Sequence, residues 1–277
     1  MMIQKSDGAY LYATTDLAAV RYRVRRYAPK AILYVVANQQ ALHFEQLKMA
    51  VARLGIAPAH LVEHVKFGML LDSHHKKLST REGTSVGLSE VLEEATIRSR
   101  AFMRERASLP GHELSEEEID RIAPVVGIGA LKYQDLSQQR LHDVLLDWDR
   151  MLSLNGNNVP YLQYSIVRIQ SILRKGGKEE SDGAVELLDL HPLERTLARM
   201  LVRFPWVVDH AARTYEPHRI ADYAYALAGA LHQLYEEVPV LQAAPSDRRR
   251  RMELLRRTAA TLTAALGLLG IGVPEKM

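Results

Sequence analysis

The chain has 277 residues, enough for one large or two ordinary domains, and its 47% hydrophobic and 25% charged residues are typical of a soluble globular protein. It contains no cysteine, which excludes disulfides and thiolate metal sites and leaves only metal sites built from histidine and carboxylate ligands. Its net charge of +3 is mildly basic and fits a polyanionic partner.

The first part of the chain alternates helical and strand patterns. Residues 1–10 lack the apolar core of a signal peptide, so we expect a cytoplasmic protein. A helix is predicted over Leu17–Tyr27, with Thr14 or Thr15 placed to cap its first amides. The apolar run Ala31–Ala37 shows no alternation, which suits a strand of a parallel sheet that is covered on both faces.

A second helix and a second strand follow this run. The spacing of Phe44, Leu47, Val51 and Leu54 predicts the helix, and Leu61–Phe67 is the next predicted strand. Helix, strand, helix, strand is half of a doubly wound α/β domain. A complete nucleotide-binding domain of this type would need an earlier strand–helix half, and only about ten residues precede Tyr12.

The remainder of the chain is almost wholly helical in pattern. Ser115 and Glu118 form a capping box after a helix predicted from Leu88 to about Arg106. The later helices are predicted over 159–173, 191–203, 217–237 and 246–269. The last carries one apolar stripe, and its run 264–273 is too short to span a bilayer, so no membrane partner is expected. We place a domain boundary near Met151: residues 1–150 form a partial α/β domain with helical connectors, and 151–277 a helix bundle.

Tyr12 and Asp16 are candidates for binding a guanidinium group. They are four residues apart, so they can share one side of a helix that begins early. A carboxylate can pair with a guanidinium through two hydrogen bonds, and an aromatic ring offers it a cation–π face. The alternative is that Asp16 only favours the helix N-terminus and Tyr12 is a core residue.

Together with Ser79-Thr80-Arg81-Glu82-Gly83, these residues resemble the arginyl-tRNA synthetases, which are class I aminoacyl-tRNA ligases. The resemblance runs almost from end to end, and it implies that Tyr12, Asp16 and Gln40 hold the arginine side chain. It also implies that the loop with Lys77, Ser79, Thr80 and Arg81 is the family's variant of the class I Lys-Met-Ser-Lys signature. Cations and hydroxyl donors there would stabilise the charge on departing pyrophosphate when ATP, with magnesium, activates arginine. Without the resemblance, a solvated basic loop is the simpler reading.

One element of the resembled family is missing. Class I synthetases bind ATP chiefly through a His-x-Gly-His element, and none occurs in this sequence. Gly127-Ile128-Gly129 lies inside a helical pattern, which favours close packing over a phosphate cradle. We therefore expect the chain to be the C-terminal portion of such a synthetase, with half of the catalytic domain, and to be inactive alone.

The resemblance also implies a tRNA-binding surface in the helical part. Tyr161, Gln163, Tyr164 and Arg168 match the entry to the family's anticodon-binding domain, and aromatic, amide and cationic groups together can stack on and hydrogen-bond splayed bases. Core packing is the alternative for one of the two tyrosines. The run Arg248, Arg249, Arg250 and Arg251 could contact phosphates, or it could be a solvated charged face. The histidines show no metal-ligand spacing.

Two functions remain open at this point. The first is arginine–tRNA ligase, with the chain either as a fragment of the enzyme or as one half of a split enzyme whose first half is supplied by another polypeptide. The second is a non-catalytic, synthetase-like protein that binds tRNA or a protein partner. The retained arginine-pocket residues favour the first, and the missing half favours the second.

Overall fold

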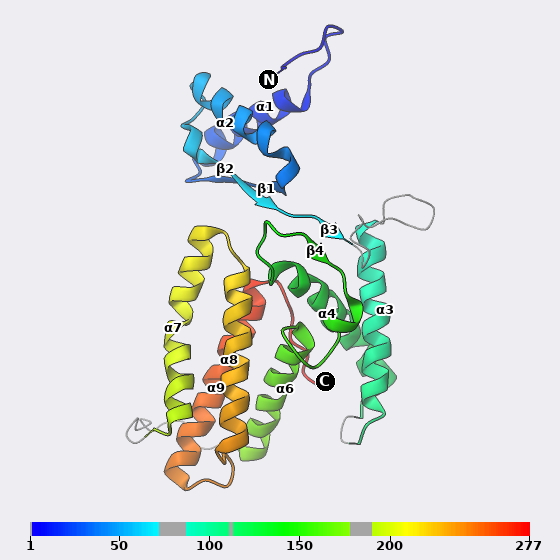
Figure 1. Ribbon diagram of the computed structural model, residues 1–277, viewed down its shortest axis with the longest axis vertical. Coiled ribbons are helices and arrows are strands. Elements are labelled where there is room, and N and C mark those ends of the chain that lie inside the picture. Colours follow the sequence, from blue (N-terminus) through cyan, green and yellow to red (C-terminus); the bar gives the residue numbers. More distant parts are fainter. Residues whose placement is uncertain (1, 72–86, 111–112, 178–189) are drawn as a thin grey trace. The chain divides into compact units, whose positions relative to one another are not determined.

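The computed structural model describes residues 2–71, 87–110, 113–177 and 190–277 (Figure 1). The chain divides into two compact units. The first comprises Met1–Met69 with Arg140–Asp143, and the second Leu70–Gln139 with Val144–Met277.

The first unit is a small α/β assembly in the predicted order. Helix α1 (Tyr12–Tyr27) leads into strand β1 (Ile32–Ala37), and helix α2 (Ala41–Arg53) leads into strand β2 (Val62–Phe67). Short 3-10 turns, η1 (Asn38–Gln40) and η2 (Ala59–Leu61), precede α2 and β2. The strands pair in parallel, with Ile32 opposite Val62 and Ala37 opposite Phe67, which confirms a parallel sheet.

The start of α1 differs from its prediction. The helix begins at Tyr12, five residues before Leu17, and its N-cap is Leu11, whose side chain makes no capping hydrogen bond. The hydroxyl of Thr14 donates to the carbonyl of Ile3, and that of Thr15 donates to the carbonyl of Tyr12 at 2.7 Å. The predicted threonine cap is therefore wrong, because both hydroxyls bind carbonyls and leave the first amides of the helix without a side-chain acceptor.

Strand β1 is covered on one face rather than two. Ile32 is buried with Leu17, Val20 and Leu47 in a core that α1 and α2 close. On the other face Leu33 and Val35 remain 45% and 65% exposed. The uninterrupted apolar run predicted the strand correctly, but among the described residues only one of its faces has a covering layer.

The described residues of the second unit are helical apart from two short strands and the turns between elements. Strands β3 (Leu70–Leu71) and β4 (Val144–Leu145) pair in parallel. Its helices, some of which Figure 1 labels, are α3 (Leu88–Ala107), α4 (Glu116–Leu136), α5 (Trp148–Met151), α6 (Val159–Gly176), α7 (Pro192–Thr214), α8 (His218–Glu237) and α9 (Pro245–Leu268). Each predicted helix of this part is present, and Ser115 and Glu118 form the predicted capping box at the start of α4.

Two apolar cores hold this unit together. The larger lies among α6, α7, α8 and α9, and it contains the predicted stripe of α9, namely Met252, Leu255, Ala259, Leu262, Leu266 and Leu269. The smaller joins α3 and α4 to Met151 and to Val167 of α6. Because this core includes residues on both sides of Met151, the compact units do not divide at that residue. The domain boundary near Met151 stays a prediction.

Gly127 is a close-packing residue, as predicted. A Cβ atom built on Gly127 would lie 2.3 Å from the carbonyl oxygen of Ala95 in α3. Helices α3 and α4 therefore approach each other at a point where no larger side chain fits.

Candidate functional site

The first candidate site is a hydrogen-bonded pair at the carboxyl edge of the two parallel strands. His43, in the first turn of α2, donates from Nε2 to Oδ2 of Asp16 at 2.7 Å. The Asp16 and His43 side chains are 31% and 27% exposed, so both are accessible to a ligand. Since α2 begins where β1 ends, the pair marks the edge at which open α/β sheets bind ligands.

The other two predicted arginine-binding residues are more exposed. Tyr12, one helical turn before Asp16, is 88% exposed, and Gln40 lies exposed in the turn η1. No motif in the sequence singled out His43. Its place three residues after Gln40, immediately beyond a strand, is the signal that could have found it.

Lys77, Ser79, Thr80 and Arg81 of the predicted catalytic loop lie outside the described residues. Within the described ranges, no group of three or more histidine and carboxylate side chains is arranged to hold a metal ion. No helix in the described part of the chain is both long and apolar enough to cross a membrane.

A second candidate site lies among the helices α6, α8 and α9. Tyr161 and Ser165 of α6 both hydrogen-bond His232 of α8, at 3.3 Å from the tyrosine hydroxyl and 3.1 Å from the serine Oγ. Burial lowers the pKa of His232, and the nearby charge of Arg168 lowers it further. Burial raises the pKa of the Tyr161 hydroxyl. This network is neutral and partly buried, so it can orient hydrogen bonds without a charge of its own.

A shallow pocket adjoins this network. Ile169, Ile172, Leu231 and Leu255 are apolar lining residues, and Ser165, Arg168, His232, Tyr235 and Glu236 supply polar groups. The guanidinium carbon of Arg168 lies 4.2 Å from the ring centre of Tyr235, a cation–π contact. Arg168 is exposed, so its planar group is available to stack on a second flat partner.

Gln163 and Tyr164 are placed differently from each other. Gln163 is fully buried, and its Nε2 donates to the carbonyl of Gly272 at 2.7 Å. The prediction that Gln163 contacts RNA is corrected by this burial, because a fully buried amide cannot reach a base. Tyr164 is half-buried against the smaller core, with the Arg106 guanidinium 5.5 Å from its ring centre. Of the two tyrosines, Tyr161 is the one beside the pocket.

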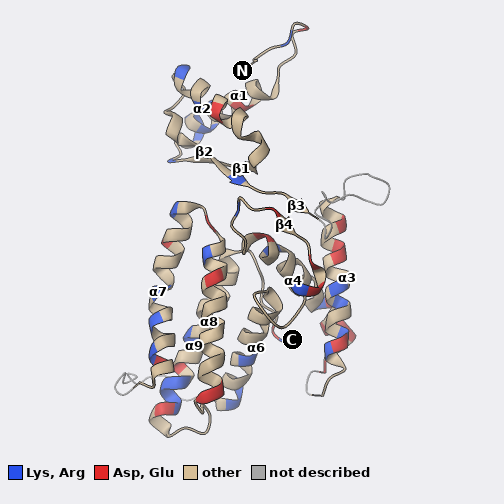
Figure 2. Cartoon of the chain, in the orientation of Figure 1, with Lys and Arg blue, Asp and Glu red and all other residues tan. Residues whose placement is uncertain are grey.

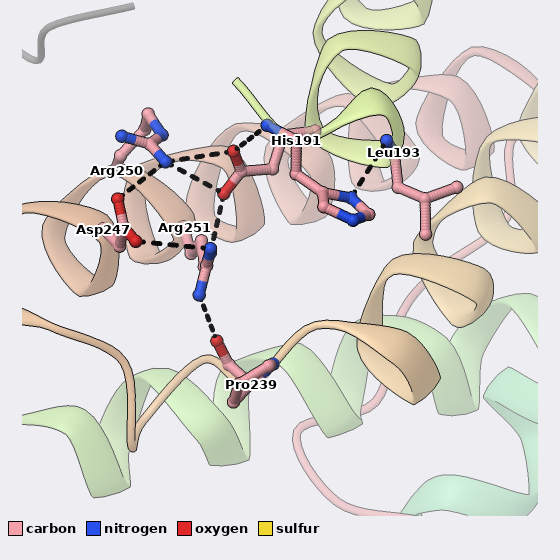
Figure 3. Close-up of polar contacts among 7 residues, drawn as sticks. His191, Leu193, Pro239, Asp247, Arg250 and Arg251 are labelled. Carbon is pink, nitrogen blue, oxygen red and sulfur yellow. Dashed lines mark hydrogen bonds and ion pairs between the residues drawn. The ribbon is translucent and has the colours of Figure 1, made fainter. Parts of the chain in front are cut away.

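The arginine run at the start of α9 splits into buried and exposed members. Arg250 and Arg251 are 8% and 9% exposed, and they pair with the fully buried carboxylate of Glu194 at 3.1 Å and 2.6 Å (Figure 3). Arg250 also pairs with Asp247 at 2.8 Å, and Arg251 donates to the carbonyl of Pro239 at 2.7 Å. The prediction of phosphate contacts is therefore corrected for Arg250 and Arg251, because their guanidinium groups are already engaged inside the protein.

The other two arginines of the run have different surroundings. Arg248 is partly buried and donates to the carbonyl of Gly176 at 2.8 Å. Arg249 is the exposed member of the four. A phosphate could approach Arg249 without breaking a contact described in this structure.

Two family models match the sequence and together cover most of it. The model described as "tRNA synthetases class I (R), catalytic domain" matches residues 1–148. The model described as "DALR anticodon binding domain" matches residues 162–277.

Curated relatives match over the whole chain. An arginine–tRNA ligase of Frankia casuarinae is 45% identical over all of this chain and 46% of its own length. One of Laribacter hongkongensis is 42% identical over all of this chain and 48% of its own length. The chain thus spans about half the length of the curated relatives it matches.

Solved structures show the same relationship. The arginyl-tRNA synthetase of Thermus thermophilus matches 100% of this chain and 51% of its own, with a TM-score of 0.86 at 28% identity. That of Plasmodium falciparum matches 99% of this chain and 46% of its own, with a TM-score of 0.84 at 26% identity. Since a family model covers more than half of the sequence and the relatives align along all of it, the chain belongs to the arginyl-tRNA synthetase family of class I tRNA synthetases.

Proposed function

We propose that this chain acts as the C-terminal portion of an arginine–tRNA ligase, an enzyme that attaches arginine to its tRNA at the expense of ATP. The proposal assigns the first unit to arginine and the helix bundle to the anticodon region of tRNA. It places the reaction in the cytoplasm and assigns ATP, with magnesium, to the complete enzyme. A polypeptide carrying the rest of the catalytic domain would complete the active site.

The observation that carries the proposal is the Asp16–His43 pair at the carboxyl edge of β1 and β2. The Oδ2 atom of Asp16 accepts a hydrogen bond from His43, whereas its Oδ1 atom accepts none from the described residues. That oxygen is left for a cationic ligand, and a guanidinium could bind it from one side while His43 fixes the carboxylate from the other. Tyr12 and Gln40, exposed near Asp16 and His43 in the sequence, would complete the recognition of arginine.

The helix bundle would bind tRNA through the pocket beside Arg168. Its apolar lining residues and the exposed Arg168 guanidinium suit an unstacked base. Tyr161 would act by holding His232 at the rim, and Arg249 would add a phosphate contact. Tyr164 remains a candidate for packing against the same RNA.

Binding of matched tRNA transcripts to the purified chain tests this function. We expect the chain to prefer a transcript with an arginine anticodon over the same transcript with the anticodon changed, measured by fluorescence anisotropy. Arg168→Gln should reduce that preference about fivefold or more, because stacking on one base contributes roughly 1–3 kcal/mol.

Arg174→Gln is the matched control, since Arg174 is an exposed arginine on the same helix but lies outside the pocket. It should leave the preference within about twofold. Equal binding of both transcripts by the unaltered chain would refute anticodon recognition. A non-catalytic binding protein would then be the better description.

A further inference from the structure

The end of α1 and the turn after it form a strongly basic segment. Residues 21–30 contain Arg21, Arg23, Arg25, Arg26 and Lys30 and not one carboxylate. The whole chain has a net charge of +3 and this segment carries +5, so the remaining residues sum to −2 and the segment is a local concentration of positive charge. Figure 2 marks the lysines and arginines of this unit in blue.

Four of these five cations are exposed and have no acidic partner in the described part of the chain. Arg23 is the exception, because it is half-buried and donates to the hydroxyl of Tyr34 at 2.8 Å. The exposed members form no ion pair with a described carboxylate; they are Arg21, Arg25, Arg26 and Lys30. By contrast, Arg98, Arg100 and Arg104 of α3 each pair with a carboxylate.

Two exposed tyrosines lie among these cations. Tyr22 and Tyr27 are 59% and 64% exposed, and their ring centres are 6.2 Å apart with the rings nearly perpendicular. The Arg26 guanidinium carbon lies 5.6 Å from the ring centre of Tyr27. We call Arg21, Tyr22, Arg25, Arg26, Tyr27 and Lys30 the α1 basic patch. Exposed rings between unpaired cations match the two needs of a single-stranded nucleic acid, which are stacking surfaces for bases and charges for phosphates.

A stabilising role at the helix end explains only part of this patch. Arginines in the last turn of a helix interact favourably with its dipole, which accounts for Arg25 and Arg26. Arg21 lies more than a turn earlier, and Lys30 lies beyond the helix. The dipole also gives no reason for two large rings in solvent, where each exposes apolar surface at a cost.

The patch lies away from the arginine site. Helices α1 and α2 both end where a parallel strand begins, so their C-terminal ends share the amino edge of the sheet. Arg53, exposed in the last turn of α2, adds a further cation at this edge. Asp16 and Arg25 are about 14 Å apart along the helix axis at 1.5 Å per residue. A ligand on the patch therefore does not need the carboxyl edge.

We propose that the α1 basic patch binds the backbone and unpaired bases of RNA, as a second RNA-binding surface separate from the helix bundle. The identity of that RNA as tRNA rests on the proposed function, whereas the binding chemistry does not. The patch binds single-stranded RNA of any base sequence, since phosphates and base faces are common to all single strands.

The test is a titration of the full chain with fluorescently labelled oligo(U) and, separately, with an arginine tRNA transcript across a range of salt concentrations. The variant Arg21→Gln/Arg25→Gln/Arg26→Gln should weaken oligo(U) binding at least about tenfold near 0.1 M salt. It should also reduce the slope of log K against log salt by about 2, because three phosphate contacts on a single strand each contribute about 0.7.

The matched control is Arg98→Gln/Arg100→Gln/Arg104→Gln, which removes the same three charges where carboxylates already neutralise them. We expect its affinity and its salt slope to stay within about twofold and about 0.5 of the unaltered chain, respectively. Equal losses in the two variants would overturn the proposal, because net charge alone would then explain the binding. Unchanged oligo(U) binding in the first variant would overturn it as well.

Tyr22→Leu gives a readout that charge removal does not. Loss of a stacking surface should weaken oligo(U) about fivefold or more and leave the salt slope unchanged. If oligo(U) binding depends on the patch while arginine tRNA is not preferred, the proposed function fails and the patch stands. If the arginine tRNA is preferred over oligo(U), and neither the triple arginine variant of the patch nor Tyr22→Leu changes the affinity for either RNA, the patch fails and the proposed function stands.

Discussion

Glu194 is a fully buried acidic residue, so its carboxylate needs partners inside the protein. Its carboxylate is fully buried at the start of α7, where it accepts hydrogen bonds from Arg250 and Arg251 and from the backbone N–H of His191. A buried carboxylate is tolerated only when it is paired and hydrogen-bonded, and here two cations and one amide supply those partners. The cluster thereby ties the beginning of α7 to the beginning of α9.

Glu194→Gln should destabilise the protein by about 3–5 kcal/mol, because it leaves two buried guanidinium groups without their main counter-charge. Urea unfolding followed by circular dichroism measures the change. Glu253→Gln is the control, since Glu253 is 25% exposed and pairs with Arg257 near the surface. It should cost less than about 1 kcal/mol. Similar costs for both variants would show that the Glu194 cluster is no stronger than a surface pair.

His232 should make the stability of the helix bundle depend on pH. Its pKa in the folded chain lies below the ordinary value of 6.5, so the unfolded chain binds a proton that the folded chain does not. Stability should therefore be at its full value above that ordinary pKa and fall as the pH drops toward the lowered one. Urea unfolding at about pH 7.5 and about pH 5.5 should show a smaller pH dependence for His232→Gln than for the unaltered chain. The same pH dependence in His232→Gln and in the unaltered chain would contradict this prediction.

At the scale of elements, the crossing of α3 and α4 depends on the absence of a side chain. Gly127 faces the backbone of α3 at Ala95, and Ser99 lies beside it. Glycine in a helix interior costs about 0.5–1 kcal/mol relative to alanine, so its presence here is offset by closer packing.

Gly127→Ala should destabilise the protein by about 1–3 kcal/mol, because the added Cβ would overlap a backbone carbonyl that cannot move without shifting α3. Gly267→Ala in α9 is the matched control, since nothing lies within 4 Å of a Cβ at that position. It should be neutral or stabilising by up to about 1 kcal/mol. Thermal unfolding of the two variants decides the matter, and a destabilised Gly267→Ala paired with a stable Gly127→Ala would contradict this account of the crossing.

The elements that the sequence predicted are those with local causes. The stripe of α9 and the Ser115–Glu118 capping box depend on residues a few positions apart, and both are present. What the sequence could not reveal depends on distant partners. Gln163 is bound by Gly272, 109 residues away, and Arg251 by Glu194, 57 residues away. Amides and arginines on a helix carry no local sign of such partners, so their burial could not be predicted.

The proposed arginine site also combines residues near in sequence with a partner far along the chain. Asp16 could be proposed from its neighbours in sequence, whereas its pairing with His43, 27 residues further on, required the turn between β1 and α2. The family resemblance supplied Gln40 and the loop with Ser79 and Thr80, which no periodicity indicates.

At the scale of the whole molecule, the sequence matches about half the length of its curated relatives. Its 277 residues contain no His-x-Gly-His element. We expect the purified chain to show no arginine-dependent exchange of pyrophosphate into ATP, with tRNA present, because ATP would lack most of its partners. Measurable exchange by this chain alone would contradict that expectation.

A complementation assay extends this prediction to Asp16. The part of the Frankia casuarinae relative that this chain does not match would be added, and exchange measured at increasing arginine concentrations. If activity appears, Asp16→Asn should reduce kcat/KM for arginine by an amount equivalent to about 2–5 kcal/mol, because a guanidinium would lose its charged partner. Glu45→Gln, an exposed carboxylate of α2, should have little effect. An unchanged arginine dependence in Asp16→Asn would remove this residue from the pocket.

Helix α1 carries Asp16 near one end and the α1 basic patch near the other, with Leu17 and Val20 packed on the sheet between them. Successive residues of a helix are rotated by about 100°. One residue inserted between Val20 and Arg21 would therefore turn Val24, which packs against this core, about 100° away from it. Point substitutions in this helix change one contact at a time, whereas a single-codon insertion or deletion would change the facing of every residue beyond it. We expect α1 to accept many amino-acid exchanges and almost no change of length.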